Sequence, residues 1–152
     1  MKTPLLAATI RGHEQAVTLL LDHGADPNVA AAGYSALHWA AGSSESTLTG
    51  PFGIQAESGE WSVLGGLRGE TKRAIVKALL AHGADPNVAD EEASTPVMFA
   101  AQHGHAEIIR RLLDAGADLG ARGDHGLTAL GFARQNGHGE TAALLEAAGG
   151  PN

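Results

Sequence analysis

The chain of 152 residues contains no cysteine and few aromatic residues. Without cysteine it can form neither a disulfide nor a thiolate metal site. Aromatic residues make up 4% of the chain whereas 43% is hydrophobic, so Leu, Ile, Val and Ala must build the core. Aliphatic side chains of this kind suit helices that pack at close range. We therefore expect one helical domain that spans residues 1–152.

Positive charge and long apolar runs are also scarce. The 10 Lys and Arg residues are outnumbered by 17 Asp and Glu residues, which gives a net charge of −7. Nucleic acid is therefore not an expected partner, because phosphate binding needs clustered Lys and Arg. No stretch reaches the length of a membrane span, and the opening residues 1–4 lack the regions of a secretory signal. We expect a cytoplasmic protein without a membrane partner.

Glycine is abundant, with 21 copies, and it marks an internal repeat. Nearly identical segments lie at 22–28 and 81–87, with a shorter copy at 114–118 and a worn copy at 146–149. Twelve residues before the glycine of each segment stands a Gly-His pair, except in the second copy, which has Thr71-Lys72 instead. Nine residues further upstream, the first, third and fourth copies open on Thr3, Thr95 and Thr128, and the second copy opens on Ser35, further from its marker.

The distances between these opening residues give the period. Thr95 and Thr128 are 33 residues apart and Thr3 and Ser35 are 32 apart, whereas Ser35 and Thr95 are 60 apart, about 27 more than one period. The markers place these extra residues between Gly42 and Thr71. The sequence thus predicts four repeats, at about 1–32, 33–92, 93–125 and 126–152, with an insertion at 43–70 in the second.

Each repeat is predicted to contain two helices. Thr3 and Thr95 are expected N-caps, each followed by a proline at a position where its missing N–H costs nothing. A second helix has apolar residues at helical spacing and ends at Gly24, Gly83 or Gly116, in a left-handed conformation that glycine adopts cheaply. Asp-Pro-Asn then turns the chain.

These residues resemble the ankyrin repeat, with its Thr-Pro-Leu-His opening, its Gly-His pair between helices and its Gly-Ala-Asp close. The resemblance covers the chain apart from the insertion, and it implies an all-α solenoid with finger loops and a concave face. The opening histidine is kept only as His38, and Glu146 replaces the leucine found at Leu21, Leu80 and Leu113. A polar residue is expected there in a terminal repeat.

The aromatic residues fall on positions that vary between repeats of this kind or in the insertion. The position after the opening histidine is Ala7, Trp39, Phe99 and Phe132 in successive repeats, so stacking would align three rings along the concave face. Two interpretations are open: the rings thicken the core, or they form an exposed apolar patch for a partner. We expect the second, with binding residues Tyr34, Trp39, Phe99, Gln102, His103, Phe132, Gln135, Asn136, Phe52 and Trp61.

The finger residues Asp90, Glu91 and Glu92 add an acidic edge. Such a surface would suit a protein or peptide that carries both apolar and basic groups. The insertion holds Phe52 and Trp61 among other apolar residues, which is too many for a solvated linker. An insertion that folded over the concave face would make a small-molecule pocket, while the alternatives are a mobile loop or an oligomer contact.

The sequence offers little for catalysis. Six of the eight histidines occupy repeat positions and are expected to bond backbone or the next repeat, which leaves His103 and His125. No histidine pair has the spacing of a zinc site, and there is no nucleophile elbow. We therefore expect no metal, no cofactor and a non-catalytic recognition module. The alternative is an acid–base enzyme of the cyclase or hydrolase kind, closed by the insertion, with candidate residues His103, Asp124, Glu57 and Glu60.

Overall fold

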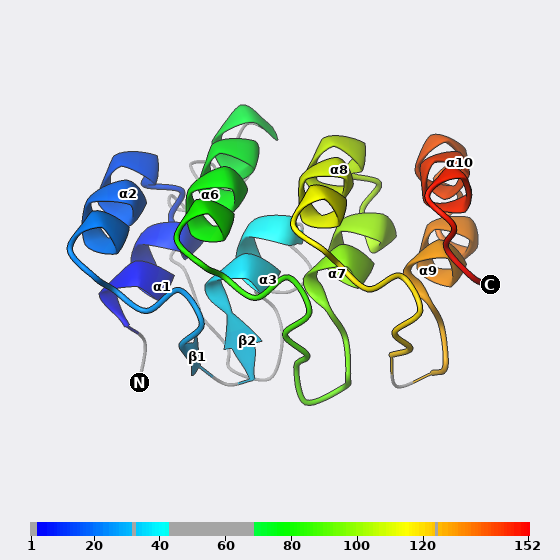
Figure 1. Cartoon of the computed structure of the whole chain (residues 1–152), viewed down its shortest axis with the longest axis horizontal. Coiled ribbons are helices and arrows are strands. Elements are labelled where there is room, and N and C mark those ends of the chain that lie inside the picture. Colours follow the sequence, from blue (N-terminus) through cyan, green and yellow to red (C-terminus); the bar gives the residue numbers. More distant parts are fainter. Residues whose placement is uncertain (1–2, 32, 43–68, 124) are drawn as a thin grey trace, which may run out of the picture.

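The computed structural model describes residues 3–31, 33–42, 69–123 and 125–152. In this part of the chain eight helices follow one another as four antiparallel pairs (Figure 1). The pairs are α1 (Pro4–Ile10) with α2 (Glu14–Asp22), α3 (Ala36–Ala41) with α6 (Gly69–Ala81), α7 (Pro96–Gln102) with α8 (Ala106–Asp114), and α9 (Ala129–Gln135) with α10 (Gly139–Ala147). The prediction of an all-α solenoid is confirmed.

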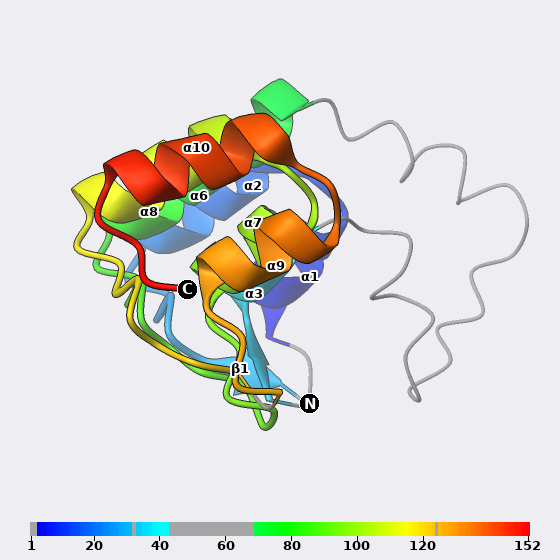
Figure 2. The same cartoon turned by 90° about the vertical axis from the view of Figure 1, so that its right-hand side faces the viewer.

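The helices form two layers. The first helices of the pairs (α1, α3, α7 and α9) make one layer, the second helices (α2, α6, α8 and α10) make the other, and the finger loops extend below the first layer (Figures 1 and 2). Each helix contacts its equivalents in the adjacent repeats. In the second repeat the finger is a short antiparallel ladder of β1 (Ala30–Ala31) and β2 (Tyr34–Ser35).

The core lies between the two layers and repeats with the sequence period. Leu79, Leu112 and Leu145 stand at equivalent positions of three successive second helices, and each is fully buried. The first helices contribute smaller residues, such as Ala41, Ala101 and Ala133, which let the layers approach closely. The core is therefore aliphatic, as the composition predicts.

The starts of the first helices match the predicted caps with one exception. The hydroxyl of Thr3 accepts a hydrogen bond from the amide of Leu6 (3.2 Å), and the hydroxyl of Thr128 accepts one from Gly131 (3.2 Å). Thr95 is the N-cap residue of α7 as predicted, in an extended conformation, but its buried hydroxyl has no hydrogen-bond partner among the described residues. The Met98 amide donates instead to the carbonyl of Thr95 (3.0 Å), so the backbone satisfies this donor.

The second helices end at left-handed glycines, as expected. Gly24, Gly83 and Gly116 have φ angles of 85°, 87° and 93°. The helix α6 begins at Gly69, two residues before the Thr71 marker, and it is longer than the other second helices. The first helix of the same repeat ends at Ala41 with Gly42 as its C-cap, next to the predicted start of the insertion.

The Asp-Pro-Asn turns also join neighbouring repeats. The Asn28 side chain donates to the carbonyl of Gly83 (3.1 Å) and accepts from the amide of Asp85 (2.7 Å). Asn87 makes the same two bonds one repeat further on, to Gly116 (3.1 Å) and from Asp118 (2.6 Å). These asparagines therefore bridge the repeats at the ends of the second helices.

Candidate binding surface

Four rings from the second and third repeats gather into one aromatic cluster, formed by Tyr34, His38, Trp39 and Phe99. Tyr34 lies at the start of β2, His38 and Trp39 lie on α3, and Phe99 lies on α7. The Tyr34 ring centroid is 5.8 Å from that of Trp39 and 6.0 Å from that of Phe99, and the His38 and Phe99 centroids are 5.4 Å apart. The tilted and edge-on arrangements are those that aromatic pairs favour.

Three rings of the cluster combine core contact with an accessible side. Tyr34, Trp39 and Phe99 are half-buried, and the last two also pack against the aliphatic core. His38 is fully buried beneath them. The surface is therefore an apolar patch held in place by the core, and its use by a partner stays a prediction.

The acidic finger that leads into α7, with Asp90, Glu91 and Glu92, lies beside this cluster. Burial and then the negative charges of Asp90, Glu92 and Glu91 raise the pKa of Tyr34, so these carboxylates act on its ring. Gly33, next to Tyr34, faces the Glu91 side chain so closely that an added Cβ would stand 3.0 Å from its Cγ. The acidic residues thus form one edge of the aromatic cluster.

Asp90 organises that finger. Its Oδ1 accepts the amides of Glu92 (2.9 Å) and Ser94 (2.8 Å), and its own amide donates to the Ser94 carbonyl (3.0 Å). Its Oδ2 is buried and has no hydrogen-bond partner among the described residues. The same holds for the Trp39 indole N–H. Buried polar atoms without partners cost free energy, so Asp90 Oδ2 and the Trp39 indole N–H are two unsatisfied polar groups at this place.

The predicted binding residues of the third and fourth repeats are more scattered. Phe132 is half-buried on α9, and its ring lies near Gly123, where an added Cβ would stand 3.6 Å from Cε2. Gln102 and Gln135 are exposed at the ends of α7 and α9. The Asn136 amide donates to the Phe132 carbonyl of its own helix (2.8 Å), so it is engaged locally.

The remaining predicted site residues lie outside the described residues. These are Phe52 and Trp61, proposed as part of a lid, and the acid–base candidates Glu57, Glu60 and Asp124. The small-molecule pocket and the enzyme closed by the insertion depend on them, so both stay predictions. His103 is the one acid–base candidate that the structure describes.

Four of the six repeat histidines are bonded as predicted. His38 bonds Ser35 through Nδ1 and the Ser94 carbonyl through Nε2 (2.9 Å), which joins the second and third repeats. His82 Nε2 bonds Asp22 of the first repeat (3.0 Å), and His138 Nε2 bonds the Gln102 carbonyl (3.0 Å). His23 bonds the Leu19 carbonyl of its own helix (2.8 Å).

For His13 and His105 the prediction was wrong. His13 is exposed, and its ring has no hydrogen-bond partner among the described residues. His105 has a buried Nε2 without a partner in the same part of the chain. The ring centroids of His103 and His105 are 6.1 Å apart.

The loss of the His105 bond has a cause in the second repeat. The residue equivalent to Gln102, whose carbonyl bonds His138, is Gly42, and the Gly42 carbonyl accepts the Lys72 ammonium instead (2.9 Å). Lys72 stands where other repeats have the histidine of the Gly-His pair. Sequence reasoning noted this exchange but missed its consequence, and it also missed the bridging role of Asn28 and Asn87, which their recurrence could have indicated.

The described residues show neither a metal centre nor a membrane span. No group of three or more His, Asp or Glu side chains among them is placed to hold a metal ion. No helix in the same ranges is long and apolar enough to cross a membrane.

The fold and the recurring bonds define a solenoid of stacked helical repeats, and comparison with family models identifies which one. A model of ankyrin repeats, in three copies, matches residues 1–48 and 68–150. The chain belongs to the ankyrin-repeat family. Ankyrin repeats generally mediate protein–protein interactions. A search of curated proteins found no match.

Proposed function

We propose that this chain is a non-catalytic recognition module that binds a protein or peptide on its concave face, at the aromatic cluster. The observation that carries the proposal is the meeting of three half-buried rings, Tyr34, Trp39 and Phe99, beside an acidic finger. The framework of the repeats does not require aromatic residues there, since Ala7 stands at the position of Trp39 in the first repeat. Anchors of this size at the centre of an interface commonly supply most of its binding energy.

The chemistry of the surface indicates what the partner presents. The rings accept an apolar side chain, and their faces attract a cation. Asp90, Glu91 and Glu92 add negative charge at the edge, which favours a basic group of the partner and speeds its association. A segment that places an Arg or Lys side chain next to an apolar one therefore fits this surface. Each good cation–π contact contributes about 0.5–2 kcal/mol.

A selection from a displayed library of random peptides tests the proposal. The wild-type chain is expected to enrich peptides that pair an aromatic or large aliphatic residue with Arg or Lys. Synthetic copies of these peptides should bind the Trp39→Ala variant more weakly than the wild type by about 2 kcal/mol, which is roughly a thirtyfold increase in the dissociation constant. The double variant Glu91→Gln/Glu92→Gln should slow association and reduce its dependence on salt.

The control is Leu19→Ala, which removes a side chain that is 60% exposed on α2, away from the cluster. This variant should bind like the wild type, and circular dichroism should show the same helix content for all four proteins. Enrichment of acidic peptides, or equal binding by Trp39→Ala, would contradict the proposal. Loss of helix content in Trp39→Ala would instead show that the ring is needed by the core, and the Glu91/Glu92 variant would then decide.

A further inference from the structure

A second group of charged and hydrogen-bonding side chains lies where α6 and α8 begin. A hollow of about 250 Å³ opens there. It shares no residue with the aromatic cluster. Its lining residues are Lys72, Arg73, Gly104, His105, Ala106, Glu107, Ile108, Arg110 and Glu140. The net charge of the whole chain is −7, whereas this hollow is lined by three cations, Lys72, Arg73 and Arg110, and two carboxylates, so the sign of the charge is locally reversed.

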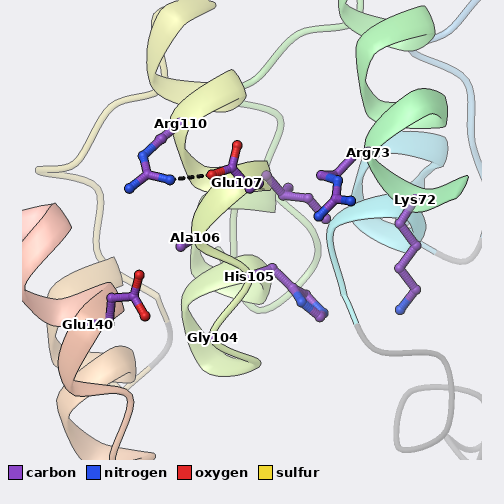
Figure 3. Close-up of a pocket in the computed structure, with 9 residues that line it drawn as sticks. Lys72, Arg73, Gly104, His105, Ala106, Glu107, Arg110 and Glu140 are labelled. Atoms are coloured by element: carbon purple, nitrogen blue, oxygen red, sulfur yellow. Dashed lines mark hydrogen bonds and ion pairs between the residues drawn. The ribbon is translucent and has the colours of Figure 1, made fainter. Parts of the chain in front are cut away.

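Two of the cations, Lys72 and Arg73, lie on one side of this hollow. Figure 3 shows Lys72 and Arg73 extending from the start of α6 toward the side of α8 where the His105 ring lies. The carboxylate of Glu107 is bonded to Arg110, and this pair and Glu140 lie on the other side of the view. The acidic residues of the lining therefore leave the positive charge of Lys72 and Arg73 uncompensated, since neither forms an ion pair among the described residues.

Lys72 is unusual because it is a buried cation. Its side chain is 8% exposed, and its ammonium has one hydrogen-bond partner among the described residues, the Gly42 carbonyl. An ammonium has three donors, and burying it without an opposite charge is costly. Burial accordingly lowers the pKa of Lys72. A bound anion would offset this cost.

The neighbouring histidines show the same lack of negative charge. Burial, followed by the positive charges of Lys72, His103 and His138, lowers the pKa of His105 to about 4. Burial, Lys72 and His138 act in the same direction on the pKa of His103. Nε2 of His105 is the buried atom that lost its backbone acceptor to Lys72. When Nε2 of His105 carries a proton, it is therefore a hydrogen-bond donor without an acceptor among the described residues.

The start of α8 adds backbone donors to this side. His105 is the N-cap residue of α8, a helix of nine residues, and its side chain makes no cap hydrogen bond. The first amides of a helix have no partner within it, and the helix dipole favours an anion at this end. The amides of Glu107 and Ile108 are in this position, and both residues line the hollow.

We propose that the hollow between the starts of α6 and α8 binds a tetrahedral oxyanion, phosphate or sulfate, through Lys72, Arg73, His105 and the first amides of α8. Several donors and two full positive charges match a doubly charged ion better than a single carboxylate. The site arises from the exchange of the repeat histidine for Lys72 in the second repeat. A repeat with the ordinary Gly-His pair would pair His105 with the Gly42 carbonyl and would bring no buried ammonium.

Titration of the full-length chain with inorganic phosphate, followed by NMR of the His105 ring and of the α8 amides, tests this site. Phosphate is expected to bind with a millimolar dissociation constant, to raise the pKa of His105 and to shift the amides of Glu107 and Ile108. Arg73→Gln should weaken binding about tenfold, the loss of one charge-assisted contact. Lys72→Met should weaken it at least as much, with an unchanged fold by circular dichroism.

The matched control is Lys77→Gln, because Lys77 lies one turn further along α6, is exposed and does not line the hollow. It removes the same charge as Arg73→Gln and should leave binding unchanged. Equal weakening by the two variants, or an equal shift of His105 with chloride at the same ionic strength, would overturn the proposal. If Lys72→Met loses its fold, Arg73→Gln against Lys77→Gln decides.

O-phosphoserine, used as a second probe, distinguishes the source of the group. Binding at least as tight as that of phosphate would show that the site takes a phosphate carried by a larger molecule. Much weaker binding would show that it takes the free ion. Neither result depends on the aromatic cluster, so this site and the proposed peptide surface can fail separately.

Discussion

Position 93 shows how one residue of a repeat can depart from its equivalents. Ala93 has a φ angle of 59°, whereas the equivalent positions of the neighbouring repeats are Gly33 (81°) and Gly126 (70°). The left-handed conformation costs a residue with a Cβ about 1–2 kcal/mol. Asp90 holds this finger closed by accepting the amides of Glu92 and Ser94. The finger beside the aromatic cluster is therefore fixed in a strained form that the other fingers avoid with glycine.

The buried ring of His105 is expected to make the stability of the fold depend on pH. Its pKa falls from 6.5 to about 4 in the folded chain, so the folded state binds the proton less readily than the unfolded state. The stability that this residue contributes is complete above the unfolded pKa and is lost as the pH falls from about 6.5 toward 4. The shift corresponds to about 3 kcal/mol at most. His105→Gln should remove this part of the pH dependence.

Urea unfolding of both proteins near pH 7 and near pH 4.5 measures the difference, in buffers without phosphate or sulfate. The wild type should lose more stability between the two pH values than His105→Gln does. His13→Gln is the matched control, because it removes the exposed histidine at the equivalent position of the first repeat. Parallel losses in wild type and His105→Gln would show that protonation of this ring does not oppose folding.

At the scale of elements, the asparagine bridges decide how firmly the ends of the second helices are joined. Asn87→Ala would remove two hydrogen bonds between the third repeat and the second and leave the Gly116 carbonyl and the Asp118 amide to water. Because these groups are exposed, the loss is expected to be about 1 kcal/mol rather than the sum of two buried bonds. Asn28→Ala should cost about the same, since it makes the same two bonds one repeat earlier.

Thermal or urea unfolding of the two variants beside Asn136→Ala checks this prediction. Asn136 is also exposed, but its side chain bonds the Phe132 carbonyl of its own helix, so its loss breaks no bridge and should cost less. Equal effects at all three positions would mean that the bridges contribute no more than a local cap. The third repeat has Gly120 at this position, so its bridge to the fourth repeat is missing from the sequence itself.

For the whole molecule, the period predicts most of the fold and less of the surface. Helix ends, left-handed glycines and the two layers follow from residues that recur every 33 positions. The same spacing places Trp39 and Phe99 on one side, but the ring contacts with Tyr34 depend on how a finger meets a helix. The unbonded hydroxyl of Thr95 could not be predicted either, because it depends on whether the Met98 amide donates to that hydroxyl or to the Thr95 carbonyl. The unpaired Nε2 of His105 depends on whether that nitrogen or the Lys72 ammonium donates to the Gly42 carbonyl.

A solenoid stabilised by contacts between neighbours should respond differently to the same change at its centre and at its end. Leu112 and Leu145 are equivalent, fully buried leucines of α8 and α10. Replacing either by alanine leaves a cavity that costs roughly 3 kcal/mol. Helix α8 contacts α6, α7 and α10, whereas α10 contacts only α8 and α9 among the described helices with substantial contact. Leu112→Ala should therefore lower the stability of the whole stack.

Leu145→Ala should instead release the fourth repeat while the first three stay folded. Hydrogen exchange measures this directly, because the amides of α9 and α10 would lose protection in Leu145→Ala and those of α7 and α8 would keep it. In Leu112→Ala protection should fall in all repeats together, and the urea transition should move without becoming broader. A uniform loss of protection in both variants would show that the four repeats unfold as one unit. Trp39 lies on α3 and Phe99 on α7, whereas α9 carries Phe132. If only α9 and α10 lose protection in Leu145→Ala, the aromatic cluster therefore survives loss of the fourth repeat.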